Sequence, residues 1–168
     1  RQCGIATFTA DLSDAIRHEF PRLDTFVLAM NDAGASHGYP SKVRYAIDEG
    51  DEAAYRHAAA FLSEEKADVL SVQHEYGIYG PRAGSHLLAL LRAAQLPIVS
   101  TLHTVLRQPN AEQRAVMDEL TQRSDRLVVM SPRGATLLHE VHGVSLGKID
   151  VIPHGIPHVP VDPAAKGR

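Results

Sequence analysis

Short apolar runs alternate with amphipathic segments along almost the whole chain, and this alternation restricts the fold more than any other feature. The apolar runs fall at 69–72, 98–102, 127–129 and 149–152. Several of them are apolar without the every-second-residue pattern of a half-exposed strand, which is typical of strands buried on both faces. Strands that alternate with helices form parallel sheets covered on both sides. We therefore predict an α/β fold with a doubly wound, mostly parallel sheet and helices on both faces.

The segments between these runs carry helical signals. Residues 4–18 place apolar side chains at gaps of three and four, and 51–66 is rich in alanine and opens on acidic residues. Pro132 suits the first turn of a helix, and Gly143 suits the position just after its end. The remaining expected elements are helices at 84–97, 110–124 and 132–143 and strands at 25–32 and 43–47.

The composition is that of one ordinary globular domain. The chain has 168 residues, of which 44% are hydrophobic and 22% charged. Its net charge of -3 gives no electrostatic basis for binding nucleic acid. Cys3 is the only cysteine, so an internal disulfide is excluded, which fits a reducing compartment such as the cytoplasm. No apolar run is long enough to cross a bilayer.

Polar side chains follow the ends of three predicted strands. His74, Glu75 and Tyr76 follow the first run, His103 follows the second, and His154 follows the last. In open parallel sheets, ligands bind beyond the carboxyl ends of the strands. These residues are therefore candidates for binding a polar ligand, and Glu75 could act as a base. The alternatives are a solvated loop at 74–76 and a core histidine bonded to backbone at 103.

Two further patterns give weaker indications. Gly4 opens the first helix, whose free N–H groups would suit a phosphate, although an ordinary helix start explains the same residues. The ten histidines suggest a metal site, but the pair His139 and His142 lacks a carboxylate or cysteine partner at ligand spacing. Prolines keep His154 and His158 from forming a helical pair. We expect no metal. Nucleophile-elbow and P-loop motifs are both absent.

Five segments occur in an order that resembles a known family. They are "GIATFT", "VQHEYGIYG", "TLHT", "SDRLVVMS" and "KIDVIPHGI". Together they resemble the N-terminal domain of retaining glycosyltransferases of the GT-B fold, in the group 1 or family 4-like set that includes sucrose and mannosyl transferases. The resemblance implies one Rossmann-like half of a two-domain hexosyltransferase, either cytoplasmic or peripheral to the membrane. Its partners would be a nucleotide-sugar donor and a carbohydrate or other hydroxyl acceptor, with no metal or other cofactor and no nucleic acid.

The resemblance also implies roles for individual residues. Gly4, Ile5 and Ala6 would approach the donor diphosphate. His103 matches the family histidine that faces the transferred sugar. The stretch from His74 through Glu75 to Tyr76 would lie on the acceptor side. His154 stands where the family usually has asparagine, so the resemblance assigns it no role.

The resemblance sets the expected domain limits as well. Residues 1–158 would form the acceptor-side domain, and 159–168 would lead toward an absent C-terminal, donor-binding domain. A strand would normally precede the Gly4 turn, so we expect an open sheet edge and self-association through it. The isolated chain is expected to be inactive. The alternatives are a non-catalytic Rossmann-like binding domain and a nucleotide-dependent oxidoreductase, which the poor glycine pattern disfavours.

Overall fold

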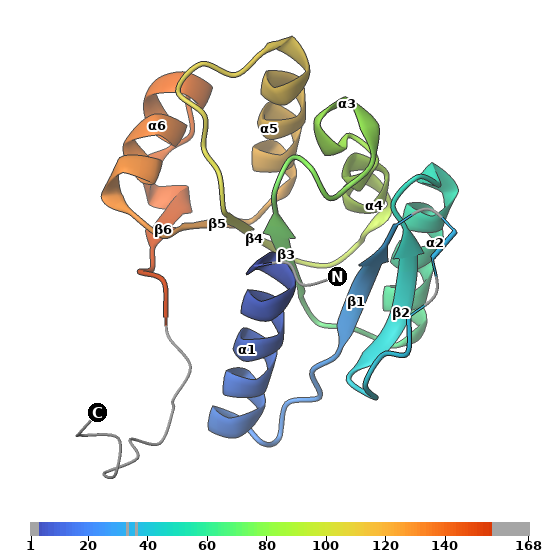
Figure 1. Cartoon of the computed structure of the whole chain (residues 1–168). Coiled ribbons are helices and arrows are strands. Elements are labelled where there is room, and N and C mark those ends of the chain that lie inside the picture. The colour runs from blue at the N-terminus through green and yellow to red at the C-terminus, as the bar shows by residue number, and fades with distance from the viewer. Residues whose placement is uncertain (1–3, 33, 36, 156–168) are drawn as a thin grey trace, which may run out of the picture.

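The computed structural model describes residues 4–32, 34–35 and 37–155, and it contains two parallel sheets (Figure 1). The smaller sheet pairs β1 (Val27–Asn31) with β2 (Val43–Asp48). The larger sheet has the order β3-β4-β5-β6. Its strands are β3 (Leu70–His74), β4 (Ile98–Leu102), β5 (Arg126–Val129) and β6 (Ile149–Val151). Every strand pair is parallel, so the predicted α/β class is confirmed.

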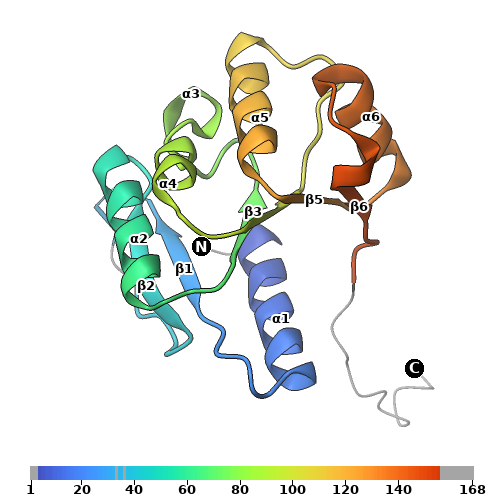
Figure 2. The same ribbon diagram turned by 180° about the vertical axis from the view of Figure 1, so that it is seen from behind.

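Within the described residues, six α-helices cover the two sheets unevenly. They are α1 (Gly4–Glu19), α2 (Glu52–Glu64), α3 (Pro81–Gly84), α4 (Leu87–Ala93), α5 (Ala111–Arg123) and α6 (Pro132–His142), and a short 3₁₀ turn spans Leu146–Lys148. Helix α2 contacts α4, α4 contacts α5, and α5 contacts α6, so these four form one layer. Figures 1 and 2 show α1 on the other side of the four-stranded sheet from α5 and α6. Helices therefore lie on both faces, as predicted.

The helix ends follow local sequence signals. The Asp51 side chain accepts a hydrogen bond from the backbone N–H of Ala53 and begins α2. Asn110 and Gln113 exchange two hydrogen bonds in a capping box that begins α5. Pro132 lies in the first turn of α6, and Gly143 ends that helix in the left-handed conformation at φ 67°. Both predictions for the ends of α6 are confirmed.

Several elements begin or end one or two residues from their predicted limits, and two of the differences have larger consequences. Strand β3 starts at Leu70 and continues to His74, because Gln73 and His74 keep pairing with β4 in register with Thr101 and Leu102. His74 is therefore the last strand residue and not part of a polar loop. The helix expected over 84–97 is shorter, since α4 covers only Leu87–Ala93 and the separate turn α3 precedes it.

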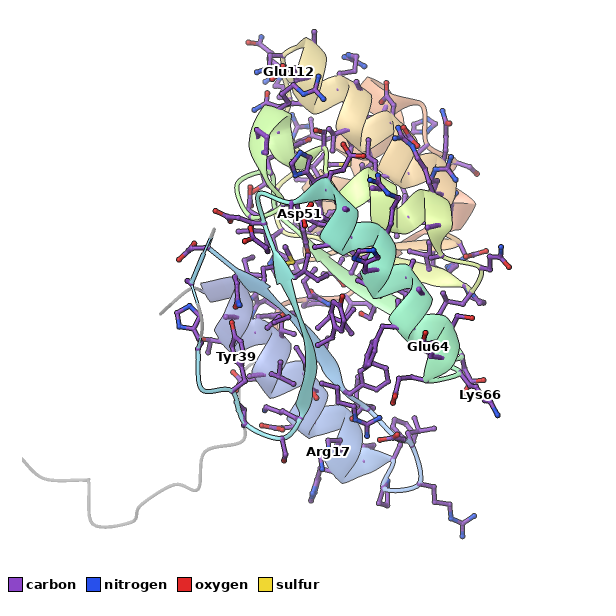
Figure 3. All side chains as sticks on the ribbon, turned by 90° about the vertical axis from the view of Figure 1, so that its right-hand side faces the viewer. Arg17, Tyr39, Asp51, Glu64, Lys66 and Glu112 are labelled. Carbon is purple, nitrogen blue, oxygen red and sulfur yellow. The ribbon has the colours of Figure 1, made fainter. Side chains whose placement is uncertain are left out.

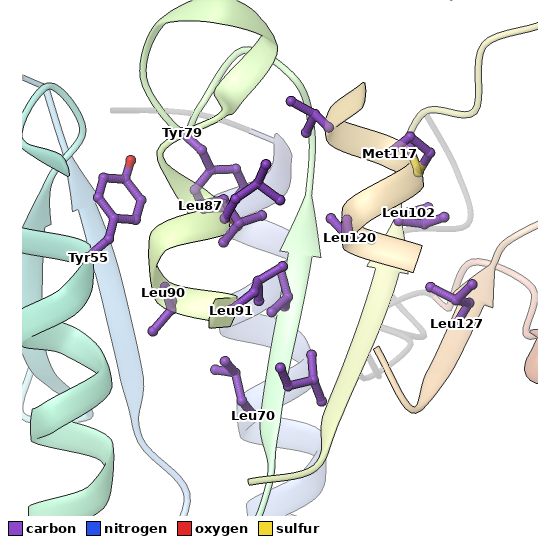
Figure 4. Packing of buried hydrophobic residues seen from close by; sticks show 14 of the residues in the cluster. Tyr55, Leu70, Tyr79, Leu87, Leu90, Leu91, Leu102, Met117, Leu120 and Leu127 are labelled. Carbon is purple, nitrogen blue, oxygen red and sulfur yellow. The ribbon is translucent and has the colours of Figure 1, made fainter. Parts of the chain in front are cut away.

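The main core lies between the four-stranded sheet and the helices packed above it (Figure 4). Leu87, Met117, Leu120, Leu127 and Leu138 are each less than 2% exposed. They come from α4, α5, β5 and α6, so residues far apart in the sequence meet in one interior. Burial of this kind contributes about 2 kcal/mol or more for each large apolar side chain.

The smaller sheet and α1 are packed less tightly. Figure 3 views β2 from its open side, with α1 on one side of it and α2 on the other. No residue of β1 is fully buried, and Ser13 is the only buried residue of α1. Among the described residues, β1 and β3 have no hydrogen bonds to each other, so each sheet has an open edge there. The sequence analysis expected such an edge. Self-association through it stays a prediction.

Gly80, in the loop after β3, packs closely against the turn that follows β2. Its φ of +80° lies in the left-handed region. A Cβ at this position would come within 2.6 Å of both the Glu49 carbonyl oxygen, in the turn after β2, and the His86 ring, just before α4. The same Glu49 carbonyl accepts a hydrogen bond from the Tyr55 hydroxyl at 3.2 Å and lies 3.2 Å from His86 Nδ1. Only glycine fits between these groups.

Some residues named in the sequence analysis are not covered by the structure. The predicted linker at 159–168, His158 and Cys3 lie outside the described residues. None of the helices within the described ranges combines the length and apolar character that crossing a membrane requires.

Candidate active site

Four of the predicted site residues lie at the carboxyl ends of β3 and β4, at one edge of the larger sheet. They are His74, Glu75, Tyr76 and His103. The His103 backbone N–H donates to the His74 carbonyl at 3.1 Å, which extends the β3–β4 pairing by one residue. A pocket of about 230 Å³ lies next to this point, between the segment after β4 and the start of α6. His103, Ser131 and Arg133 are its polar lining residues, and Leu102, Val129 and Leu137 are among its apolar ones. The pocket therefore combines an apolar wall with a few convergent polar groups.

A second hollow of about 580 Å³ lies between the ends of α2 and α4. Alanine side chains line much of it, together with Arg56 and Lys66. It is at the amino-terminal edge of the sheet, because α2 leads into β3 and α4 leads into β4. We place the candidate site at the smaller pocket, since the strand ends and His103 are there.

His103 is half-buried and held from two sides. Its Nε2 lies 3.0 Å from the Gln73 side-chain oxygen. Phe8 of α1 lies edge-on to its ring, with 5.0 Å between the ring centroids. Phe8 also contacts the ring of His154 at 5.1 Å. Burial lowers the pKa of His103, the Glu75 carboxylate raises it, and the neighbouring His154 lowers it. The net lowering leaves the His103 imidazole neutral at pH 7.

Glu75 connects the ends of β3 and β4. One carboxylate oxygen accepts from the Thr104 hydroxyl at 2.5 Å, and the other accepts from the Tyr76 backbone N–H at 2.9 Å. The side chain is half-buried. This arrangement fixes the carboxylate beside the loop that carries His103, where it also acts on the pKa of that histidine.

His74 and Tyr76 lie deeper than the sequence analysis expected. The His74 side chain is fully buried, between Tyr76 at 5.0 Å and Tyr79 at 6.3 Å between ring centroids. Neither His74 ring nitrogen nor the Tyr76 hydroxyl has a hydrogen-bond partner within the described ranges. Burial lowers the pKa of His74 to about 4 and raises that of Tyr76 to about 12. Both side chains are therefore neutral at pH 7 and face the protein interior.

Gly4, Ile5 and Ala6 form the first turn of α1 and not a loop before it. Gly4 and Ala6 are exposed, and a Cβ at Gly4 would meet no atom of the described residues within 4 Å, apart from the adjoining backbone. Phe8, one turn further on, is the residue that contacts His103. This turn therefore lies near the candidate site, and N–H groups in the first turn of a helix can donate to an anion.

The histidine pair at 139 and 142, which was considered for a metal, has other contacts. His139 Nδ1 lies 2.9 Å from the Val144 carbonyl oxygen, and His142 Nδ1 lies 2.6 Å from an Asp118 carboxylate oxygen. Within the ranges that the structure describes, no three histidine, cysteine or acidic side chains form a group able to hold a metal.

The sequence analysis missed Gln73, Phe8 and Arg133. Gln73 left a signal, because it is a polar residue in the middle of a buried strand segment. No specific sequence signal marked Phe8, since its spacing in α1 fits an ordinary apolar helix face. The pocket position of Arg133 depends on how α6 packs, which the sequence alone does not give.

The comparison with protein families gives a match over most of the chain. Residues 4–159 match the model of Glycosyltransferase Family 4. The chain belongs to this family. The match spans all strands and helices described above, and it confirms the resemblance found in the sequence. The comparison with curated proteins gave no match. In this family 4 domain, the candidate residues His74, Glu75, Tyr76 and His103 lie at the carboxyl edge of a Rossmann-like sheet, the usual ligand side of such folds.

Proposed function

We propose that this domain is the acceptor-side half of a retaining hexosyltransferase that moves a sugar from a nucleotide-sugar donor to an acceptor hydroxyl. The observation that carries the proposal is the position of His103, a neutral imidazole held at the carboxyl edge of β4 and lining the pocket. Family membership supports the class of reaction. The proposed reaction uses no metal or other cofactor.

Each group at the edge has a proposed role. The first turn of α1, at Gly4, Ile5 and Ala6, approaches the donor diphosphate with its N–H groups. His103 faces the transferred sugar. The stretch from His74 to Tyr76 forms the acceptor side, where Glu75 is the member that lies nearest the surface.

A second domain is part of this proposal. One turn of N–H groups and one imidazole leave much of a nucleotide sugar uncontacted. Positioned groups stabilise a transition state strongly only in a closed site from which water is excluded. In an open half-site water competes for the same groups. We therefore expect no measurable transfer, and at most weak donor binding, from the 168-residue chain alone.

The test uses an enzyme in which this domain is joined to its donor-binding domain. Nucleotide-sugar donors are screened for transfer, and His103→Ala is compared with wild type and with His57→Ala, which changes an exposed histidine of α2. We expect His103→Ala to lower turnover roughly 10²-fold or more, the scale for losing one positioned group. The control should retain activity, and both variants should fold.

The outcomes separate the alternatives. Wild-type turnover in His103→Ala would remove that residue from the mechanism. Donor binding without transfer would support a non-catalytic binding domain instead. Strong transfer by the 168-residue chain would contradict the need for a second domain.

A further inference from the structure

Gln73 is a polar residue inside a buried strand, and both its side chain and its backbone have partners. The residue is 7% exposed. Its side-chain oxygen lies 3.0 Å from His103 Nε2, and its amide nitrogen donates to the Ser71 hydroxyl at 3.3 Å. Its backbone carbonyl accepts from the Tyr79 hydroxyl at 2.7 Å. These contacts hold the amide in one place and direct its oxygen at the imidazole.

The strand register brings Gln73 and His103 together. Gln73 pairs with Thr101, two residues before His103 on the neighbouring strand. The His103 backbone N–H then bonds to the carbonyl of His74. With Phe8 packed edge-on to the same ring, the imidazole is held between one polar and one aromatic contact.

This contact determines which ring nitrogen carries the proton. An amide oxygen can only accept a hydrogen bond, so His103 Nε2 must be the donor. A neutral imidazole with its proton on Nε2 has a free lone pair on Nδ1. Nδ1 has no hydrogen bond within the part of the chain that the structure describes.

We propose that Gln73 is a positioning residue that fixes His103 in the Nε2–H tautomer and so offers Nδ1 to the transferred sugar as a hydrogen-bond acceptor. The inference rests on the proposed function and adds a specificity to it. A sugar hydroxyl can donate to Nδ1, whereas a fluorine at the same carbon cannot. The preferred donors are therefore sugars with a free hydroxyl at the position that His103 contacts.

The test measures the tautomer directly by nitrogen-15 NMR of the histidine rings. The His103 signals are identified by their loss in His103→Asn. Wild type is compared with Gln73→Leu, which removes the acceptor, and with Gln73→Glu, which keeps one and adds a charge. Gln122→Leu, at an exposed glutamine of α5, is the matched control.

We expect the Nε2–H form in wild type and in the control. Gln73→Leu should give a mixture of tautomers and a lower pKa of His103, because the charged ring also loses an acceptor. Gln73→Glu should restore the Nε2–H form and raise the pKa above that of wild type. An Nδ1–H form in wild type, or a tautomer and titration unaffected by Gln73→Leu, would overturn the proposal. If Gln73→Leu fails to fold, an unchanged titration in Gln73→Glu overturns it equally.

Activity gives the second part of the test. In the two-domain enzyme, Gln73→Leu should lower turnover and Gln73→Glu should shift the pH profile upward while restoring part of the rate. Deoxyfluoro donors should be poor substrates of wild type and lose their disadvantage in Gln73→Leu. Equal use of the fluorinated and natural donors by wild type would overturn the specificity. If no donor supports transfer, the proposed function fails, and the tautomer measurement still reports on Gln73 separately.

Discussion

The two sheets of this domain are packed very differently, although both are parallel and both carry helices. Four of the five residues in β3 and in β4 are buried, whereas β1 has none. Helix α5 buries Val116, Met117, Leu120 and Thr121, whereas α1 buries Ser13 alone. The proposed catalytic His103 belongs to the tightly packed region, and the proposed phosphate-binding turn of α1 belongs to the loosely packed one. Under the proposed function, the residue that must be held in position lies in the tightly packed region, and the turn that must adapt to the diphosphate lies in the loosely packed one.

The largest expected difference concerns core truncations. Leu120→Ala in α5 should cost about 3–4 kcal/mol, because it leaves a cavity in a fully buried site. Leu28→Ala in β1 should cost only about 1–2 kcal/mol, since that side chain is partly exposed. Denaturant unfolding of both variants measures the difference. Equal losses would show that the two regions are packed alike.

The second prediction concerns the buried His74. Its folded pKa of about 4 lies below the ordinary value of 6.5. The unfolded chain therefore binds a proton that the folded chain does not between these values, and stability falls as the pH drops through this window, by up to about 3 kcal/mol. His74→Phe should be as stable as wild type at pH 7 and much less sensitive to pH.

Urea unfolding at several pH values from about 7 down to about 4.5 checks this prediction. Staying above that lower limit avoids the contribution of Glu119, whose pKa is lowered to about 2 by its hydrogen bonds with Arg92 and Arg123. His57→Gln is the control and should keep the wild-type profile. A flat wild-type profile would contradict the prediction. Loss of transfer in a folded His74→Phe enzyme would support a role of His74 on the acceptor side.

A smaller difference is expected between two ion pairs. Glu119 bridges α4 and α5 through Arg92 and Arg123 and is one-quarter exposed, so Glu119→Gln should cost about 1 kcal/mol. Asp14 joins α1 to Lys42 but is 62% exposed, so Asp14→Asn should cost only a few tenths of a kcal/mol. Unfolding at low and high salt measures both losses. A larger effect for Asp14→Asn would mean that α1 is held more firmly than its burial indicates.

The smallest stability effect is expected at Gly4. A methyl group there would meet no atom of the described part of the chain within 4 Å beyond the adjoining backbone, so Gly4→Ala should change stability by less than about 0.5 kcal/mol. In the two-domain enzyme it should nevertheless weaken donor binding, because the methyl group would stand where the diphosphate approaches the backbone. Donor titration by calorimetry checks this. Unchanged donor affinity would move the phosphate contact away from the first turn of α1.

The sequence predicted the elements whose signals are local. Strand β4 was predicted with the limits that the structure has, because its apolar run follows Pro97 and ends in polar residues. The ends of α6 were predicted because Pro132 and Gly143 act through their own backbone restrictions. The end of β3 was misplaced, since the pairing of Gln73 and His74 with β4 depends on register between distant segments.

The sequence predicted that the candidate residues lie at one edge of the sheet, but it did not predict their surroundings. The rule that ligands bind at the carboxyl ends of parallel strands was enough to select His103. It could not show that His74 faces the core, because a strand buried on both faces has no polarity pattern that distinguishes its two sides. Nor could it show the contact between Gln73 and His103, which needs the register of two strands and a side-chain geometry. The short turn α3 was also missed, because Arg82 and Ala83 adopt positive φ values that their residue types rarely favour.

The crowding around Gly80 limits how this sequence can diverge among its relatives. Alanine at position 80 would have to displace the Glu49 carbonyl as well as the His86 ring, and the carbonyl belongs to the backbone of a turn. At Gly77, three residues earlier in the same loop, a methyl group would meet no atom of the described residues within 4 Å beyond the adjoining backbone, so this position is free to vary. Homologous sequences should therefore keep glycine at position 80, whereas position 77 should vary. A lineage that lost the glycine at 80 should show a rebuilt turn after β2 and a different residue at 86 in the same branch.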